Sequence, residues 1–226
     1  MPSSQIQSAF GRDEFECSAR ALLRDGRWAN ARVWRAEIGG VAWVVKDFAP
    51  RSILVRTLVG RFLLRRELRA LRRLDGIDGV PSAAFRVDAH AIAARFIEGL
   101  TLGKVDAERL TAPFFEQLEQ LLQTIHARGI VHLDLRGSGN MLMQPDGRPA
   151  VIDFQAALRI DWMPAALRRW FGEIDLAGVY KKWIERDAES MGADRLTVLA
   201  RMNRWRRFWL LRGYAGVRKE RRPGAA

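Results

Sequence analysis

The pattern of hydrophobic and polar positions changes near residue 97. Before it, short runs of apolar and β-branched residues flank Gly39-Gly40, which predicts a β-hairpin over residues 31–47. Apolar residues at helical spacing then predict a helix over 53–74. Two more short strands are expected within 83–96, so this part of the chain combines strands with one helix.

Helical periodicity dominates after the break at Ile97-Glu98-Gly99. An amphipathic helix is predicted over 113–128 and ends at Gly129. Apolar runs on either side of a Pro-Asp-Gly turn predict a second hairpin over 140–154. The remainder, from 158 to 218, is predicted to be helical.

This change of pattern predicts an α+β fold of two lobes. The 226 residues suffice for one large domain or for two small lobes that share a cleft, and 48% of them are apolar, enough for a sizeable core. We expect a small, β-rich N-terminal lobe with one main helix over 1–98. A mostly helical, truncated C-terminal lobe is expected over 99–226.

Composition excludes several classes of protein. An apolar content of 48% excludes a disordered chain, and 28% charged residues without a long apolar run exclude a membrane-spanning bundle. The single cysteine, Cys17, excludes a scaffold held by internal disulfides. Residues 1–15 show no secretory pattern, so we expect a cytoplasmic protein.

Positive charge is concentrated in two stretches. The net charge is +12; residues 51–73 hold eight arginines and one glutamate, and residues 201–222 hold nine basic residues and one glutamate. Both stretches interleave this charge with large apolar residues at helical spacing, which predicts amphipathic helices with arginine-rich outer faces. Three interpretations are open: a solvated face whose long side chains cover the core, docking on an anionic membrane, or nucleic-acid binding. No recognised nucleic-acid-binding pattern supports the third.

Lys46 is the only lysine in the first hundred residues, where arginine is the usual basic residue. It follows two valines in an apolar strand, where a buried ammonium needs a counter-charge. Glu67 has leucines one turn away on both sides and therefore lies on the apolar stripe of its helix. Each charge would neutralise the other. The alternative is that Glu67 lies at the surface among arginines and Lys46 ends an edge strand.

Three further polar residues, Asp134, Asn140 and Asp153, are associated with apolar, strand-like runs. An amide and a carboxylate that face one cleft are hard oxygen ligands of the kind that Mg²⁺ takes while it keeps phosphate oxygens and waters. A second carboxylate near the metal can accept a proton from an attacking hydroxyl. The alternative is that the aspartates cap loops and Asn140 is a turn residue, but the order of all five polar residues favours a shared site.

This order resembles the protein-kinase-like superfamily. The matching segments are VVK ending at Lys46, RREL around Glu67, HLDLRGSGN over 132–140 and VIDFQ around Asp153. The compact length and the IDFQ in place of a DFG turn are most similar to the bacterial lipopolysaccharide core (Kdo or heptose) kinases and to the RIO-like kinases. The resemblance implies a bilobal protein-kinase-like fold and an ATP- and Mg²⁺-dependent phosphotransferase.

The resemblance also implies a role for each matching residue. Lys46 would hold the α- and β-phosphates of ATP and be braced by Glu67. Asp134 would be the catalytic base, and Asn140 and Asp153 would bind Mg²⁺.

Other positions are implied to complete the site. Arg136, two residues after the base, would contact the transferred phosphate. Gly26 would belong to the phosphate loop, and the backbone of Arg95 to Glu98 would contact the adenine. His132 would pack and orient the catalytic loop, and Asp175 would brace that loop from behind.

The sequence departs from the kinase pattern at several points. No G-x-G-x-x-G precedes the first hairpin, and the spacing from Asp134 to Asn140 is six residues rather than five. Gln155 replaces the glycine that follows Asp-Phe, which indicates a permanently set metal site. There is no A-P-E motif and little room for an activation segment before Trp162, so a small or lipid-linked acceptor is favoured over a peptide.

We therefore expect a kinase that transfers the γ-phosphate of ATP to a hydroxyl acceptor, either a lipid-linked sugar of the lipopolysaccharide core or a protein serine or threonine. Peripheral contact with the inner face of the cytoplasmic membrane is expected, and nucleic acid is not favoured as a partner. The alternative is a catalytically silent pseudokinase that acts as a basic, membrane-associated or partner-binding scaffold. The five intact polar residues argue against this alternative, because a silent scaffold has no chemical need for them.

Overall fold

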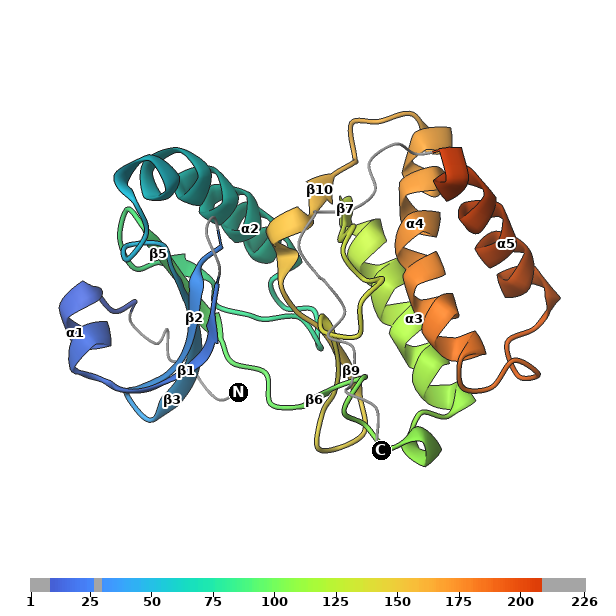
Figure 1. Ribbon diagram of the computed structural model, residues 1–226, viewed down its shortest axis with the longest axis horizontal. Helices are drawn as coiled ribbons and strands as arrows, with labels where there is room; N and C mark the ends of the chain where they lie inside the picture. The colour runs from blue at the N-terminus through green and yellow to red at the C-terminus, as the bar shows by residue number, and fades with distance from the viewer. Residues whose placement is uncertain (1–8, 27–29, 209–226) are drawn as a thin grey trace, which may run out of the picture.

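The computed structural model describes residues 9–26 and 30–208 of the chain. A β-sheet with one long helix beside it forms the N-terminal part, and a group of helices forms the C-terminal part (Figure 1). The two parts are joined through residues 96–99, between a strand of the sheet and the first strand of the second part. The α+β fold predicted from the sequence is confirmed.

Five strands form an antiparallel sheet in the order β1-β2-β3-β5-β4. Their bounds are β1 Ala19–Asp25, β2 Arg32–Ile38, β3 Val41–Asp47, β4 Phe85–Arg86 and β5 Ala91–Arg95. The predicted hairpin is β2 and β3, joined by Gly39 and Gly40 with φ of 61° and 72°, a region that favours glycine. Lys46 is paired with Val33 on one side and Ile92 on the other, so its strand lies inside the sheet.

Two N-terminal elements were not predicted from the sequence: helix α1 (Arg12–Cys17) and strand β1. Every residue of β1 is exposed, so the strand has no buried face and no alternation of apolar and polar residues. Arg12 donates to both carboxylate oxygens of Asp47 over 2.9 and 3.0 Å, and it also pairs with Asp88. These contacts fix α1 against the sheet.

The predicted helix over 53–74 is present, but it contains a π-helical stretch, Val55–Gly60, before α2 (Arg61–Leu74). Helix α2 buries Leu64 and Leu71. A π turn takes up more residues than an α turn, so the apolar positions at the start of the helix fall out of phase with this buried face. Leu58 and Phe62 are 64% and 63% exposed. The predicted amphipathic helix with an arginine-rich outer face is therefore wrong for the start of this helix, because Leu58 and Phe62 are exposed instead of facing the core.

Three helices pack together in the C-terminal part (Figure 1): α3 (Ala112–Ala127), α4 (Ala165–Ile184) and α5 (Ala193–Phe208). Phe115 of α3 stacks on Trp183 of α4, with ring centroids 5.4 Å apart and both side chains fully buried. The predicted helix over 113–128 is thus confirmed. Helices α4 and α5 lie within the predicted 158–218, of which residues 209–218 fall outside the described residues. None of the helices described is both long and apolar enough to cross a membrane.

Short strand pairs hold two loops of the C-terminal part in place. One small sheet has the order β6-β8-β9, and a separate pair is β7-β10. The bounds are β6 Leu100–Thr101, β7 Ile130–Val131, β8 Met141–Met143, β9 Pro149–Val151 and β10 Leu158–Arg159. The predicted hairpin over 140–154 is β8 and β9. Loop 132–140 therefore runs between the two ladders in one direction, and residues 152–157 return between them in the other.

Replacing Trp183 with alanine should destabilise the protein strongly. The side chain stacks on Phe115 and donates from Nε1 to Ser190 Oγ over 2.9 Å. Truncation of a buried tryptophan costs about 3–5 kcal/mol. Urea denaturation measures the change in the free energy of unfolding, and Trp162→Ala is the matched control because Trp162 is 72% exposed. Equal unfolding free energies for the two variants would contradict this packing.

Candidate active site

A cleft of about 310 Å³ lies between the sheet and the β8–β9 hairpin. Its walls are largely apolar and come from both parts of the fold; they include Leu23, Val33, Val44, Ile92 and Ile152. Four of the predicted site residues line the same cleft: Lys46, Glu67, Asn140 and Asp153. An apolar cavity with a few convergent polar groups is typical of a small-molecule site.

Lys46 is central to the charged side of this cleft. Its Nζ donates to Glu67 Oε1 and Oε2 over 2.7 and 2.8 Å, and it also donates to Asp153 Oδ1. Lys46 is 7% exposed and Glu67 4%, so the ion pair predicted from their apolar surroundings is confirmed. Strand β3, helix α2 and the turn after β9 each supply one residue, so all three elements must be in place for this charged cluster to form.

The members of the charged cluster shift one another's pKa values. Burial acts to lower the pKa of Lys46, but Glu67 and Asp153 outweigh it and hold that pKa above its ordinary value. Burial acts to raise the pKa of Asp153, but Lys46 and Arg24 hold it well below its ordinary range. Burial raises the pKa of Glu67 against the opposing charge of Lys46. One ammonium shared by two carboxylates leaves one negative charge, which the guanidinium of Arg24 beside Asp153 offsets.

Arg24 is a member of the site that the sequence pattern did not reveal. Its Nη2 lies 3.2 Å from Asp153 Oδ2, and its side chain lines the cleft. It belongs to β1, whose fully exposed residues give no sequence signal for a strand. The guanidinium side chain is 57% exposed, so it is accessible to an anionic ligand as well as to Asp153.

Loop 132–140 is braced by Asp175 of α4. Its carboxylate accepts the backbone N–H groups of His132 and Leu133, each over 2.7 Å, and its Oδ2 lies 3.0 Å from His126 Nε2. Leu133 has a φ of 64°, in the left-handed region that residues other than glycine rarely adopt. The hydrogen bond to its N–H helps to hold that conformation. The bracing role expected of Asp175 is confirmed.

His132 orients the same loop from within. Its ring is buried, its Nε2 lies 2.9 Å from the carbonyl oxygen of Ile152, and its Nδ1 accepts the N–H of Asp134 over 3.2 Å. The ring also packs on Phe154, with centroids 4.8 Å apart. Both ring nitrogens are therefore engaged, in keeping with the packing role expected of His132.

Asp134 and Asn140 meet in spite of their six-residue spacing. Asn140 Nδ2 donates to the backbone carbonyl of Asp134 and to its Oδ2, both over 2.9 Å. The intervening Gly137 and Gly139 are exposed, so the extra residue is accommodated at the surface of the loop. Asp134 is exposed too, which leaves its carboxylate accessible to a hydroxyl group.

Asn140 and Asp153 fit the magnesium site implied by the resemblance. Both line the cleft and offer hard oxygen ligands, and the lowered pKa of Asp153 keeps its carboxylate ionised. Asp153 has a φ of 68°, a left-handed conformation for a residue with a side chain. Magnesium commonly takes one or two protein ligands and completes its shell with phosphate oxygens and waters, so these two residues suffice.

Two predicted site residues, Arg136 and Glu98, are not among the residues that line the cleft. Arg136 lines a second cavity, on the side of the loop that faces α4 and α5. The side chain of Glu98 is 66% exposed and lies 3.4 Å from Arg35, whereas the preceding residues 95–97 line the cleft. The phosphate contact of Arg136 and the adenine contact of the Glu98 backbone stay predictions.

Gly26 directly follows strand β1. A Cβ at this position would lie 2.3 Å from the carbonyl oxygen of Ala31, so the close approach of these two residues requires glycine. The predicted phosphate loop continues into residues 27–29, which lie outside the described residues. Phosphate binding by Gly26 therefore also stays a prediction.

Replacing Asp175 with asparagine should destabilise the braced loop. The amide offers one oxygen where the carboxylate offers two, so one of the two backbone N–H groups loses its acceptor. A buried donor left without a partner costs about 1–3 kcal/mol. Urea denaturation measures this loss. Asp187→Asn is the control, because Asp187 also accepts backbone N–H groups, among them that of Ser190, but at a partly exposed site where water can replace a lost partner. An unchanged free energy of unfolding for Asp175→Asn would contradict the brace.

Comparison with models of known protein families assigns the chain to a family. The model of the RIO domain matches residues 50–181, more than half of the sequence. The match includes Glu67, Asp134, Asn140 and Asp153, and it begins shortly after Lys46. No curated protein matches the chain. The RIO-like part of the resemblance is thus confirmed, while closeness to lipopolysaccharide core kinases stays a prediction. The chain belongs to the RIO domain family of atypical protein kinases and is an ATP-dependent kinase-like protein.

Proposed function

We propose that this protein transfers the γ-phosphate of ATP to a hydroxyl acceptor in the presence of Mg²⁺. The observation that supports this proposal is the convergence of Lys46, Asn140 and Asp153 on one cleft, with the exposed Asp134 bonded to Asn140. Phosphoryl transfer depends mainly on positioning and charge stabilisation, and these residues offer both.

The nucleotide is proposed to bind with its adenine against the apolar walls and its phosphates toward Lys46. The raised pKa of Lys46 keeps its ammonium charged, and Glu67 fixes its direction through two hydrogen bonds. Asn140 and Asp153 would hold Mg²⁺, which when bound neutralises phosphate charge. Arg24 supplies a second cation at the same carboxylate, Asp153.

In the transfer step the acceptor oxygen attacks the γ-phosphorus. The bond between that phosphorus and the oxygen that bridges it to the β-phosphate breaks, and ADP leaves with the electron pair. The acceptor proton passes to the Asp134 carboxylate, whose Oδ2 accepts a hydrogen bond from Asn140. The bonds from Asp175 and His132 keep the loop in place during this step.

The acceptor is proposed to be a hydroxyl on a small or lipid-linked molecule, such as a sugar of the lipopolysaccharide core. Between Asp153 and the start of α4 at Ala165 the chain forms only a short 3₁₀ turn, strand β10 and a brief connection. This segment leaves little room for a platform on which an extended peptide could lie. A protein serine or threonine is the alternative acceptor.

Turnover of ATP with Mg²⁺ tests the proposal. Asp134→Asn should reduce turnover by about 10²- to 10⁴-fold with little change in ATP affinity, since it removes only the base. Asp153→Asn should weaken Mg-ATP binding itself, because it replaces a charged metal ligand with a neutral one and removes the charge that faces Lys46. Asp146→Asn, on the exposed turn between β8 and β9, is the control.

Full turnover by the Asp134→Asn variant would rule out its assignment as the base. Binding of Mg-ATP by the wild type without turnover, in the presence of sugar and peptide acceptors alike, would favour the scaffold alternative. Absence of nucleotide binding would contradict the proposed function as a whole.

We also propose that the helix leading into α2 contacts an anionic membrane surface, such as the inner face of the cytoplasmic membrane. Five large apolar side chains on it are exposed by 38–71%: Ile53, Leu54, Leu58, Val59 and Phe62. The neighbouring arginines Arg65 and Arg69 are exposed as well, and the only acidic residue of 51–73, Glu67, is buried. A solvated arginine face does not account for exposed leucine and phenylalanine, whereas this combination is typical of interfacial helices.

Substitution of Leu58→Ser together with Phe62→Ser should lower affinity for vesicles that contain phosphatidylglycerol by about tenfold or more, because the inserted apolar surface is lost. Co-sedimentation at increasing salt measures it. Leu100→Ser with Leu196→Ser is the control, since these leucines are 47% and 37% exposed on other elements. Equal vesicle binding by the two double variants would contradict membrane contact at this helix. A steep salt dependence for duplex DNA or RNA, without vesicle binding, would favour nucleic acid instead.

A further inference from the structure

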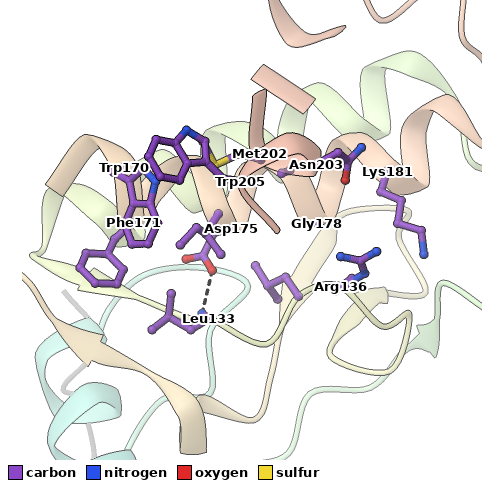
Figure 2. Close-up of a pocket in the computed structure, with 13 residues that line it drawn as sticks. Leu133, Arg136, Trp170, Phe171, Asp175, Gly178, Lys181, Met202, Asn203 and Trp205 are labelled. Carbon is purple, nitrogen blue, oxygen red and sulfur yellow. Dashed lines mark hydrogen bonds between the residues drawn. The ribbon is translucent and has the colours of Figure 1, made fainter. Parts of the chain in front are cut away.

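A second cavity, of about 350 Å³, lies beside loop 132–140. Loop residues Leu133, Leu135 and Arg136 form one wall, and helices α4 and α5 form the others (Figure 2). Residues at the far end of the same loop, Gly139 and Asn140, line the nucleotide cleft. Asp134 therefore belongs to a loop that borders both cavities.

One end of this second cavity is aromatic and apolar. Trp170 and Phe171 of α4 and Met202 and Trp205 of α5 lie together there (Figure 2). Trp205 is 57% exposed although it lies beside this cavity. Covering apolar surface of this kind with an apolar group is favourable, because it removes that surface from water.

The other end carries positive charge. Figure 2 shows Arg136 and Lys181 on the side of the cavity away from the aromatic residues. Lys181 has a distant ion pair with Glu185 at 3.6 Å, and Arg136 forms no ion pair with any residue the structure describes. The one carboxylate in the lining, Asp175, is already engaged by the backbone of His132 and Leu133. The two cations therefore face the cavity without a carboxylate of the lining to neutralise them.

We propose that this cavity binds the acceptor of the proposed phosphotransferase, and that the acceptor is an anionic amphiphile. Its carboxylate or phosphate would contact Arg136 and Lys181, and its acyl or other apolar portion would pack on Trp170, Phe171 and Trp205. This inference rests on the proposed function, because the acceptor hydroxyl must reach Asp134. Asp134 itself lines neither cavity, but it lies two residues before Arg136 on the same loop, so an acceptor anchored at Arg136 is proposed to extend its hydroxyl toward that carboxylate.

The cavity favours this ligand over other occupants. A volume of about 350 Å³ suits a small molecule or a lipid headgroup, whereas an extended peptide needs a groove. The chain's own residues 209–226 carry five basic residues and one glutamate, so their charge opposes binding next to Arg136 and Lys181.

The test compares three probes on the full chain: octyl β-D-glucuronide, octyl β-D-glucoside and glucuronate. The first two share an alkyl chain and a sugar and differ in one carboxylate, and the third lacks the alkyl chain. Titration calorimetry below the micelle concentration, with tryptophan fluorescence as a second readout, measures the affinities. We expect octyl glucuronide to bind about tenfold more tightly than either of the other probes, as a charge-assisted hydrogen bond and a buried alkyl chain each contribute that much.

Two variants test whether the probe binds in this cavity. Lys181→Ala should abolish most of the preference for the glucuronide over the glucoside, and Trp205→Ala should weaken both alkyl probes. Lys182→Ala is the matched control for charge, because Lys182 pairs with Glu185 over 2.9 Å and does not line the cavity. Circular dichroism checks that each variant is folded, and the comparison of probes on the wild type decides the question even if a variant is not.

Equal binding of octyl glucuronide and octyl glucoside to the wild type would overturn the inference, as would a preference that is unchanged in Lys181→Ala. Phosphorylation of a serine peptide that octyl glucuronide does not inhibit would also overturn it. If Mg-ATP binds and turns over in these cases, the proposed function stands and only the acceptor class fails. The expected probe affinities without any ATP turnover would support a binding site for an anionic amphiphile in this cavity and contradict the phosphotransferase.

Discussion

The buried ammonium of Lys46 is the interaction on which the arrangement of the cleft depends. It lies in an inner strand of the sheet, where the residue is only 7% exposed, and it is bonded to Glu67 of α2 and to Asp153 beyond β9. Removing one partner of a buried ion pair costs about 3–5 kcal/mol, since the other charge is left without compensation. The sheet, the long helix and the C-terminal part are therefore held in one relative position by three side chains that also line the cleft.

A second set of contacts makes that position hard to change. Arg66, the neighbour of Glu67, donates from Nε to the carbonyl oxygen of Ala157 over 2.7 Å and also to that of Ala156. Helix α2 is thus attached to the segment after Asp153 through backbone as well as through side chains. Phe154 is fully buried against His132, and Gln155 stands where a glycine would allow the turn to flip. Both features agree with the expectation that the proposed metal site is permanently set and not switched.

Among the described residues other than glycine, Ala83, Leu133 and Asp153 have a left-handed backbone, and the last two lie where chemistry is proposed. Leu133 and Asp153 both have positive φ, and each lies directly beyond a short strand pair. Conformations of this kind cost about 1–3 kcal/mol and persist only where the surroundings fix them. Here Asp175 and the ladders β7-β10 and β8-β9 supply that support. The loop they hold carries Asp134 between a nucleotide cleft and an apolar, cationic cavity, so one supported segment serves both proposed substrates.

Much of this protein follows from the sequence by itself. Local signals determine the β2–β3 hairpin, the long helices and the β8–β9 hairpin, because periodicity and glycine turns act over a few residues. The pairing of Lys46 with Glu67 is also predictable, since each is a charge in apolar surroundings and no other lysine is near in sequence. The match of the RIO domain to residues 50–181 agrees with the motifs around Glu67, Asp134 and Asp153.

Other features depend on contacts between residues that are distant in sequence, and only the tertiary structure determined them. Strand β1 has no buried face, so nothing in its own sequence shows that Arg24 lies beside Asp153. The π-helical turn places Leu58 and Phe62 outside, although their spacing alone is compatible with a buried face. The cavity beside Arg136 exists only because α4 and α5 pack behind the loop. In each case the deciding factor is the surface a side chain meets in three dimensions, which the local pattern of a single segment does not contain.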